Sequence, residues 1–208
     1  MLLSLKKIIL IEVEIKIQIF DLVSLVKAFE RENGRYKLSL IHEDTYYNMP
    51  KGLRDFKKTD EALRIRNSIE YNKLNEGDSK DFKAYITYKG KKIDKISKSR
   101  QEIECRIENP EQIKEIFSIL GFRDVFTVKK ERELYEFVFN GHKIEALIDY
   151  LPILDRYFLE VELITDFVEN LEKRREILFN FLKLFGYDKK DSIRKSYLEL
   201  ILEKKSTI

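Results

Sequence analysis

The residues from Ile11 to Ile19 alternate without a break between apolar and polar side chains. The apolar ones are isoleucine and valine, and Glu12, Glu14, Lys16 and Gln18 lie between them. A period of two predicts a β-strand with one apolar face, and β-branched residues suit a pleated surface. An antiparallel strand with a solvated polar face is a common arrangement, so this strand alone assigns no role to its two carboxylates.

The same kind of alternation recurs along the rest of the chain. Together with the first strand it predicts a sheet of about eight strands. The further strands are expected at residues 36–48, 61–69, 82–89, 99–107, 142–150 and 157–164, with two more between 122 and 139. Residues 49–60 and 70–81 are polar and are expected to be loops.

Helical spacing and end signals predict helices at about residues 21–32, 109–121 and 166–185. The second of these has Asn109 as its cap and Pro110 at its first position. Its apolar residues Ile113, Ile116, Phe117 and Leu120 are expected to form a buried stripe, and residues 198–202 are expected as a short strand or a helical tail. Strands and helices do not alternate regularly, and no linker is rich in Gly, Ser or Pro. The sequence therefore predicts one α+β domain over residues 1–208 with an antiparallel sheet.

Composition narrows the possible chemistry. The chain has 208 residues, with 40 Lys plus Arg against 37 Asp plus Glu, so a nucleic-acid partner is not expected. Cys105 is the only cysteine, and His42 and His142 are the only histidines, which excludes an internal disulfide and the usual zinc sites. Cys105 is expected on a buried apolar face, and both histidines on the surface. No apolar run is long enough to span a membrane, and a soluble cytoplasmic protein is expected.

The polar faces of several strands carry charges in groups. Carboxylates pair at Glu12/Glu14 and Glu160/Glu162, and cations occur at Lys16, Arg64/Arg66, Lys89 and Lys130/Arg132. If the sheet curls with these faces inward, the charges are costly to bury unless they are paired or hold an ion. A polyphosphate with Mg²⁺ or Mn²⁺ would satisfy both signs, because Arg and Lys bind phosphate oxygens and carboxylates bind hard cations.

These residues also carry a family resemblance. The segment Glu12-Val-Glu-Ile-Lys16 resembles the ExExK signature of the CYTH superfamily, the triphosphate tunnel metalloenzymes. Later pieces resemble the family in the same order: Arg64-Ile-Arg66, Thr87-Tyr-Lys-Gly90, Arg100-Gln-Glu-Ile-Glu104, Lys130-Glu-Arg132, Asp149 and Phe158-Leu-Glu-Val-Glu162. Two departures, Asp155 after Leu154 where the family usually has Gly and Lys91 where it often has Pro, are expected to change the chain only locally.

The resemblance implies a closed, eight-stranded antiparallel β-barrel, a triphosphate tunnel with flanking helices. Glu12, Glu14, Lys16 and Glu160 would be the catalytic residues. Metal ions, Mg²⁺ or Mn²⁺, would be held by Glu12, Glu14, Glu160 and Glu162, with Asp149 and Glu104 assisting. The phosphates would be bound by Lys16, Arg64, Arg66, Lys89, Lys130 and Arg132. The residue types themselves leave a plain ion pair between Arg100 and Glu102 open. They assign Tyr85 and Tyr197 to packing, and Lys173, Arg174 and Arg175 to a solvated helix face.

The resemblance allows several activities. A hydrolase would cleave inorganic triphosphate, thiamine triphosphate or a nucleotide, whereas a class IV adenylate cyclase would convert ATP to cyclic AMP and pyrophosphate. The sequence shows no recognisable adenine site, which favours hydrolysis of inorganic triphosphate and leaves the cyclase as the alternative. An RNA 5′-triphosphatase and a non-enzymatic polyphosphate-binding or nucleic-acid-binding barrel also remain open. The helix at 166–185 is expected to cover the tunnel or a partner chain, as in a homodimer.

Overall fold

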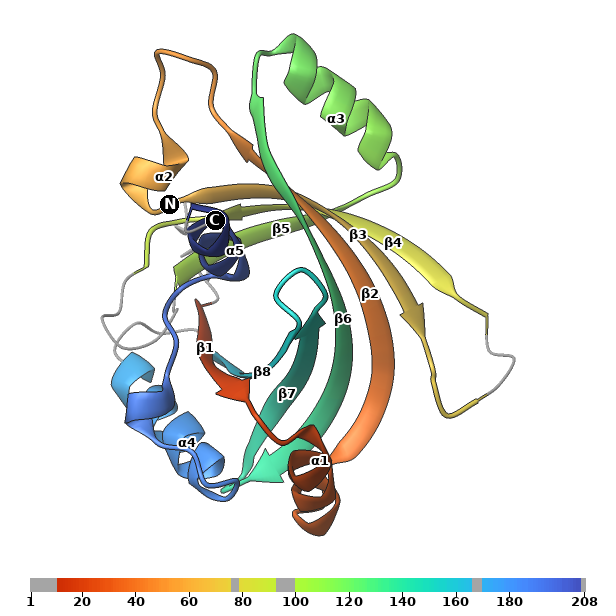
Figure 1. The fold of residues 1–208 in the computed structure, drawn as a ribbon, viewed down its shortest axis with the longest axis vertical. Helices are drawn as coiled ribbons and strands as arrows, with labels where there is room; N and C mark the ends of the chain where they lie inside the picture. The colour runs from red at the N-terminus through yellow and green to blue at the C-terminus, as the bar shows by residue number, and fades with distance from the viewer. Residues whose placement is uncertain (1–10, 76–78, 93–99, 166–169, 207–208) are drawn as a thin grey trace, which may run out of the picture.

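The structure is a computed structural model that describes residues 11–75, 79–92, 100–165 and 170–206. These residues form a strongly curled antiparallel sheet with helices packed around it, the α+β architecture predicted from the sequence (Figure 1). The described strands are β1 Ile11–Ile19, β2 Arg35–Asn48, β3 Ala62–Tyr71, β4 Asp81–Lys89, β5 Arg100–Ile107, β6 Arg123–Phe139, β7 His142–Leu151 and β8 Arg156–Thr165. The helices are α1 Leu22–Arg31, α2 Phe56–Thr59, α3 Pro110–Ile119, α4 Leu171–Lys183 and α5 Tyr197–Ser206, with a 3₁₀ turn η2 at Lys189–Asp191.

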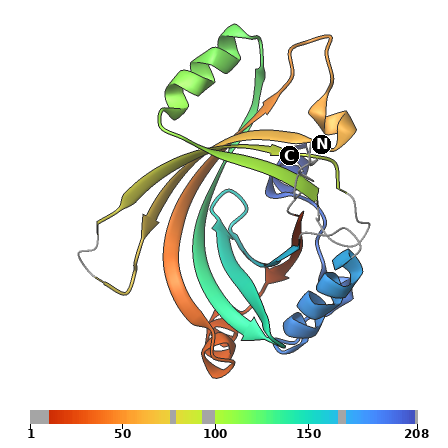
Figure 2. The same ribbon diagram turned by 180° about the vertical axis from the view of Figure 1, so that it is seen from behind.

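The strands follow one another around the molecule in the order β1-β5-β4-β3-β2-β6-β7-β8. Strand β1 pairs with β8 over nine positions, from Ile11–Thr165 to Ile19–Tyr157. On its other side, within the described residues, β1 meets β5 at the pairs Ile11–Gln101 and Glu12–Arg100. The eight antiparallel strands are thus confirmed. In the described ranges they form a curled half-barrel in which β1 and β5 pair at these two positions and not along the whole seam (Figures 1 and 2).

Strand β6 differs from the prediction of two strands between residues 122 and 139. It runs unbroken from Arg123 to Phe139, and it pairs with β2 and, from Glu131 onward, also with β7. The physical reason is that this segment holds no Gly or Pro to make a turn before Asn140-Gly141. One long strand therefore links both halves of the sheet.

The helix ends follow the capping rules. The carboxylate of Asp21 accepts a hydrogen bond from the Ser24 amide at 2.9 Å, and Asn109 caps α3 through the Gln112 amide at 3.1 Å. A short helix, α2, lies in the predicted loop of residues 49–60 and was not expected. Residues 198–202 belong to helix α5, so the helical alternative expected for this segment is confirmed. Strand β5 and helix α4 were predicted to begin at Ser99 and Asp166, which lie outside the described residues. No helix in the described ranges is both long and apolar enough to cross a membrane.

The departure at Asp155 is local, as predicted. Asp155 adopts a left-handed backbone with φ 52°, and its amide donates to the carbonyl of Leu151 at 2.9 Å. Its carboxylate accepts a hydrogen bond from the Tyr150 hydroxyl at 2.9 Å. Asp tolerates this conformation better than most residues, so the turn between β7 and β8 survives without glycine.

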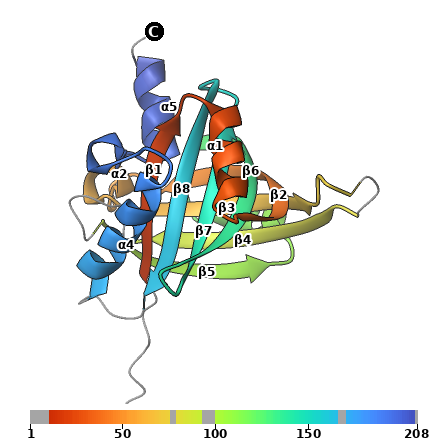
Figure 3. The same cartoon turned by 90° about the horizontal axis from the view of Figure 1, so that it is seen from below.

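The main hydrophobic core lies outside the curl of the sheet. The outward faces of β1, β6, β7 and β8 pack against α1 and α4, as the view from below makes clear (Figure 3). Val13, Ile15 and Ile17 of β1 meet Leu178 and Phe181 of α4 in this cluster, and all of them are buried. Because side chains alternate across a strand, burial of these residues turns Glu14 and Lys16 inward.

Two sequence expectations about burial are wrong. The predicted buried stripe of α3 leaves Ile116 48% and Leu120 60% exposed, because α3 stands away from the curled sheet and contacts it through Phe117 against Tyr47 (Figure 1). Cys105 of β5 is exposed and its neighbour Ile103 is 45% exposed. Helices α1 and α4 cover other strands, so the outer face of β5 remains in contact with solvent.

The packing of Phe29 generates a stability prediction. Its ring is fully buried and contacts Tyr135, Phe137 and Phe185 at centroid distances of 5.2, 4.9 and 4.9 Å. Phe29→Ala should lower the free energy of unfolding by about 3–5 kcal/mol in denaturant titrations, because it leaves a cavity in the core. The matched control Val23→Ala lies on the same helix but is 64% exposed, and should change it by less than about 0.5 kcal/mol. Equal effects of the two variants would contradict the packing described here.

Candidate functional site

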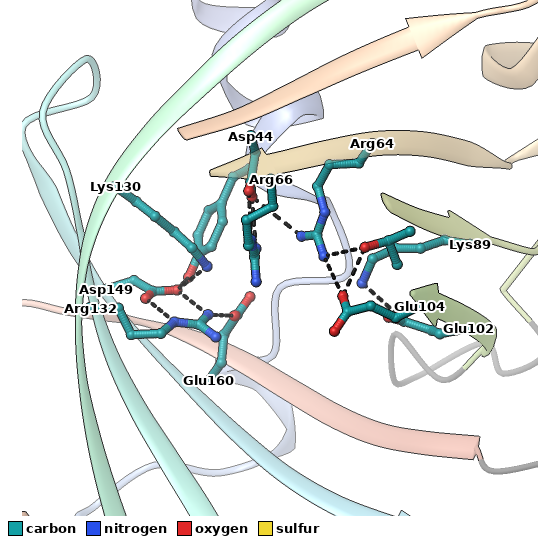
Figure 4. A network of polar contacts seen from close by, with 12 residues as sticks. Asp44, Arg64, Arg66, Lys89, Glu102, Glu104, Lys130, Arg132, Asp149 and Glu160 are labelled. Atoms are coloured by element: carbon teal, nitrogen blue, oxygen red, sulfur yellow. Dashed lines mark hydrogen bonds and ion pairs between the residues drawn. The ribbon is translucent and has the colours of Figure 1, made fainter. Parts of the chain in front are cut away.

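The inward faces of the strands enclose one cavity of about 1320 Å³. Side chains from α2 and α5 line it near one end, and Arg174 of α4 lines it near the β6–β7 turn. The charged groups of β2 to β8 converge in this space, as the close view of the polar network shows (Figure 4). The charged faces singled out from the sequence therefore turn inward together.

One wall of the cavity is acidic. Glu14, Glu160 and Glu162 each offer a carboxylate oxygen, and these oxygens lie within 4.8 Å of one another. Glu14 and Glu162 are direct neighbours across the β1–β8 ladder, so two like charges are held side by side. The side chain of Glu12, which the sequence assigned to the same group, lies outside the described part of the chain. The described carboxylates form an all-oxygen set of the kind that hard divalent cations prefer.

A buried aspartate on β7 organises the first cluster of cations. Asp149 is fully buried, and it accepts hydrogen bonds from Arg132 at 2.6 Å through both oxygens and from Lys130 at 3.1 Å. The hydroxyl of Tyr197 donates to the same carboxylate at 2.8 Å. Arg132 also reaches Glu160 at 2.5 Å, which joins this cluster to the acidic wall (Figure 4).

The electrostatics of this cluster follow from its burial. Loss of solvation and the neighbouring Arg132 lower the pKa of Lys130 to about 8 from an ordinary value of 10.5, although Asp149 opposes the shift. Burial disfavours charge on Arg132 too, but Asp149 and Glu160 outweigh it and hold the pKa of Arg132 well above its usual value. Burial and Asp149 raise the pKa of the Tyr197 hydroxyl, which stays protonated.

A second buried aspartate organises the arginines of β3. Asp44 of β2 is 2% exposed and accepts from Arg66 through both carboxylate oxygens, at 2.6 and 2.7 Å. Arg64 donates to it at 3.3 Å and to Thr87 at 3.0 Å, and lies 3.4 Å from Glu104 (Figure 4). Burial opposes ionisation of Asp44, yet the two guanidiniums hold its pKa well below its usual range. The arginine pair predicted from the sequence is thus assembled around a carboxylate that the sequence analysis did not single out.

The third charged group lies between β4 and β5. Lys89 contacts Glu102 at 2.5 Å, and Arg100 donates to the carbonyl of Gly90 at 3.3 Å. The sequence left open an ion pair between Arg100 and Glu102. In the structure Glu102 instead pairs with Lys89 of the neighbouring strand.

Three predicted site residues have surroundings that the resemblance did not imply. Asp149 and Glu104 contact cations and lie outside the cluster of Glu14, Glu160 and Glu162. Lys16 is fully buried behind the acidic wall, with its ammonium 3.9 Å from Glu160 and 3.9 Å from the centre of the Tyr197 ring. Tyr197, which the sequence assigned to packing, both packs against Phe158 and lines the cavity. No pattern within α5 distinguishes this tyrosine from an ordinary core residue.

Two further sequence expectations are corrected. His42 is 3% exposed rather than on the surface, because it shares the inward face of β2 with Asp44 and lies opposite Lys130. Burial, together with Arg66 and Lys130, lowers the pKa of His42 far below its usual range, so it is neutral. Arg174 is not simply solvated, since it lies 2.7 Å from Nδ1 of His142 at the edge of the cavity.

Comparison with known proteins identifies a family to which the chain is similar. A family model described as the CYTH domain matches residues 10–197 of the chain. A protein of Methanocaldococcus jannaschii, named as a candidate adenylate cyclase, is 40% identical over 192 residues, which cover 92% of this chain and 98% of that protein. The family-model match extends over every strand described above.

Solved structures share the fold. Protein PH1819 of Pyrococcus horikoshii OT3 has a TM-score of 0.79 and 36% identity, covering 93% of this chain and 99% of its own. A candidate adenylyl cyclase of Hippeastrum, described as revealing a dominant triphosphatase activity, has a TM-score of 0.62 and 17% identity over 93% of this chain and 96% of its own. At that identity the likeness concerns the fold alone.

The acidic wall generates a prediction about metal binding. Glu162→Gln should lower the affinity for Mn²⁺ or Mg²⁺ by at least about tenfold in calorimetric titrations, because one anionic ligand is lost. Glu131→Gln, an exposed carboxylate on β6, is the matched control. Unchanged metal affinity in the Glu162 variant would exclude this wall as the site.

Proposed function

The chain belongs to the CYTH family, and on that premise we propose that its charged cavity binds a triphosphate together with a divalent metal ion and hydrolyses it. The family supports an enzyme that acts on triphosphates, either as a triphosphatase or as an adenylate cyclase. The observation that carries the proposal is the division of one cavity into an acidic wall and a cationic wall. Glu14, Glu160 and Glu162 form the first, and Arg64, Arg66, Lys130 and Arg132 the second.

The acidic wall fits a divalent metal. Its three carboxylates supply only oxygen donors, and a divalent cation would offset the like charges of Glu14 and Glu162, which are neighbours across the β1–β8 ladder. Glu14, Glu160 and Glu162 would hold Mg²⁺ or Mn²⁺, and we extend the set to Glu12 from its place on β1. A bound divalent cation would act as a Lewis acid that offsets the charge of the phosphates.

The cationic wall fits the phosphates. Guanidinium groups present several N–H donors in a plane, which suits the oxygens of a phosphate chain, and ammonium groups bind it as point charges. Arg64, Arg66, Lys89, Lys130 and Arg132 would bind the non-bridging oxygens. Contact between Lys16 and a phosphate, which the family resemblance implies, would require Tyr197 or Glu160 to shift, since both lie against its ammonium.

The proposed reaction is hydrolysis of inorganic triphosphate. A water oxygen forms a bond to the terminal phosphorus, and the bond from that phosphorus to the bridging oxygen breaks. One water proton stays on the phosphate and the other is released to solvent, and the products are phosphate and pyrophosphate. Such a transfer depends mainly on positioning and on neutralising spreading negative charge. The chain supplies both through residues held by Asp44 and Asp149. The proposal includes a tunnel closed along the β1–β5 seam as the working form of the sheet.

A second candidate is an adenylate cyclase that converts ATP to cyclic AMP and pyrophosphate. The name of the M. jannaschii relative favours it. So does the end of the cavity near α5, where Tyr46, Leu198 and Leu202 provide apolar surface beside the cations. Such surface could accept a nucleoside attached to the phosphates.

The activity test uses the purified chain with triphosphate or ATP and Mg²⁺ or Mn²⁺, and reads phosphate, pyrophosphate and cyclic AMP together. We expect metal-dependent phosphate release from inorganic triphosphate. Glu14→Gln should reduce kcat by at least about 100-fold, because an anionic metal ligand is removed. Glu131→Gln should leave it unchanged. Cyclic AMP as the main product would select the cyclase, and full turnover in the Glu14 variant would refute the metal assignment.

The lowered pKa of Lys130 predicts how binding depends on pH. Lys130 is protonated below about pH 8 and loses its charge above it, whereas an ordinary lysine stays charged to about pH 10.5. In metal-free calorimetric titrations from about pH 7 to 9.5, the affinity for triphosphate should fall above pH 8, by up to about tenfold per pH unit. Lys130→Arg should remove this inflection, because a guanidinium stays charged. An inflection that persists in the arginine variant would assign the titration to another group.

A further inference from the structure

We infer that Asp44 is a positioning residue, which fixes the direction of Arg64 and Arg66 and at the same time limits how tightly the cavity holds a triphosphate. The inference rests on the proposed function, since it concerns how the arginine pair meets a phosphate chain. It starts from a carboxylate that belongs to neither wall as described above.

The contacts of Asp44 are directed at the arginines. Arg66 uses Nε and Nη2 to reach the two carboxylate oxygens, so its plane is fixed by a bidentate pair. Arg64 reaches one of the same oxygens through Nη1, and its Nη2 is directed to Thr87 and Glu104. The carboxylate thus joins two side chains that stand two residues apart on β3 and would otherwise repel each other.

Asp44 itself is poorly placed to bind a metal. Both of its oxygens are occupied by guanidinium donors, and Asp44 as a whole is 2% exposed. It lies on β2, and the acidic cluster is formed by residues of β1 and β8. A cation could reach it only by displacing an arginine, so its partners are the two guanidiniums.

A carboxylate at this place has two opposing consequences for a triphosphate. It holds the guanidinium planes in one orientation, which favours a single position of the phosphate chain and hence turnover. It also places a negative charge beside a bound polyanion, which weakens attraction in a cavity of low dielectric. Interactions that bind substrate and transition state equally do not raise kcat. A site that binds substrate less tightly but orients it better can therefore have a higher kcat.

Two substitutions separate charge from geometry. Asp44→Asn removes the charge and keeps the size of the side chain, so affinity for metal-free triphosphate should rise about three- to tenfold while kcat falls about ten- to 100-fold. Asp44→Glu keeps the charge but displaces it by one methylene, so kcat should fall without a gain in affinity. Glu43→Gln, on the opposite face of β2 and paired with Lys129, is the control and should change neither value.

The measurements are triphosphate affinity by calorimetry in the presence of a chelator, kcat with saturating Mn²⁺, and thermal unfolding of each variant. The wild-type chain is measured first. If the wild-type chain neither binds nor cleaves triphosphate, the proposed function fails, and this failure is distinct from any effect of the Asp44 substitutions. If the wild type is active, weaker binding with unchanged kcat in Asp44→Asn would overturn the inference. Equal affinities of Asp44→Asn and Asp44→Glu for triphosphate would also overturn the inference. Should Asp44→Asn not fold, a tighter affinity in Asp44→Glu than in the wild type would overturn it, and an unchanged one with reduced kcat would support it.

Discussion

The inner face of this protein depends on charges that are buried against one another. Desolvating a single carboxylate or guanidinium costs several kcal/mol, and a site with many of them forms only where each has a partner with good geometry. Asp44 meets this condition for Arg64 and Arg66, and Asp149 meets it for Lys130 and Arg132. Each of these pairs joins different strands. The same contacts that assemble the cations therefore also hold neighbouring strands in register.

Apolar packing on the other side of the sheet offsets the free-energy cost of burying these charges. Along β1, the isoleucines pack on α4 and the alternate residues are forced inward, so a slip of one position would exchange the two faces. The arrangement is uneven around the curl. Helices α1 and α4 cover β1, β6, β7 and β8, whereas β5 exposes Ile103 and Cys105. The strands that carry the acidic wall are the ones with the deepest packing behind them.

The sequence predicted those features that follow from alternation within one strand. It identified β1, the inward direction of Glu14, Arg64, Arg66 and Glu160, and the antiparallel class. It missed features that depend on what lies across the sheet. Strand alternation for Cys105 and helical spacing for Ile116 show that each lies on an apolar face but not whether anything covers it, and both proved exposed. Asp44 was not recognised because its partners stand on another strand, about 20 residues away. The spacing of residues within β2 places it on the inward face with His42 and Tyr46, which is the signal that could have found it.

The internal pairing has a consequence for how a metal and a triphosphate would enter together. Arg132 belongs to the cationic wall, yet it is held at 2.5 Å by Glu160, which belongs to the acidic wall. In the proposed function, Glu160 would hold a divalent cation together with Glu14 and Glu162, which would weaken its pair with Arg132. Arg132 would then have a donor group available for phosphate in place of the carboxylate. By linkage, each ligand would improve the binding of the other by the same factor. The pair of Arg132 and Glu160 would thus couple the two walls, because each residue would exchange its present partner for a ligand of opposite charge.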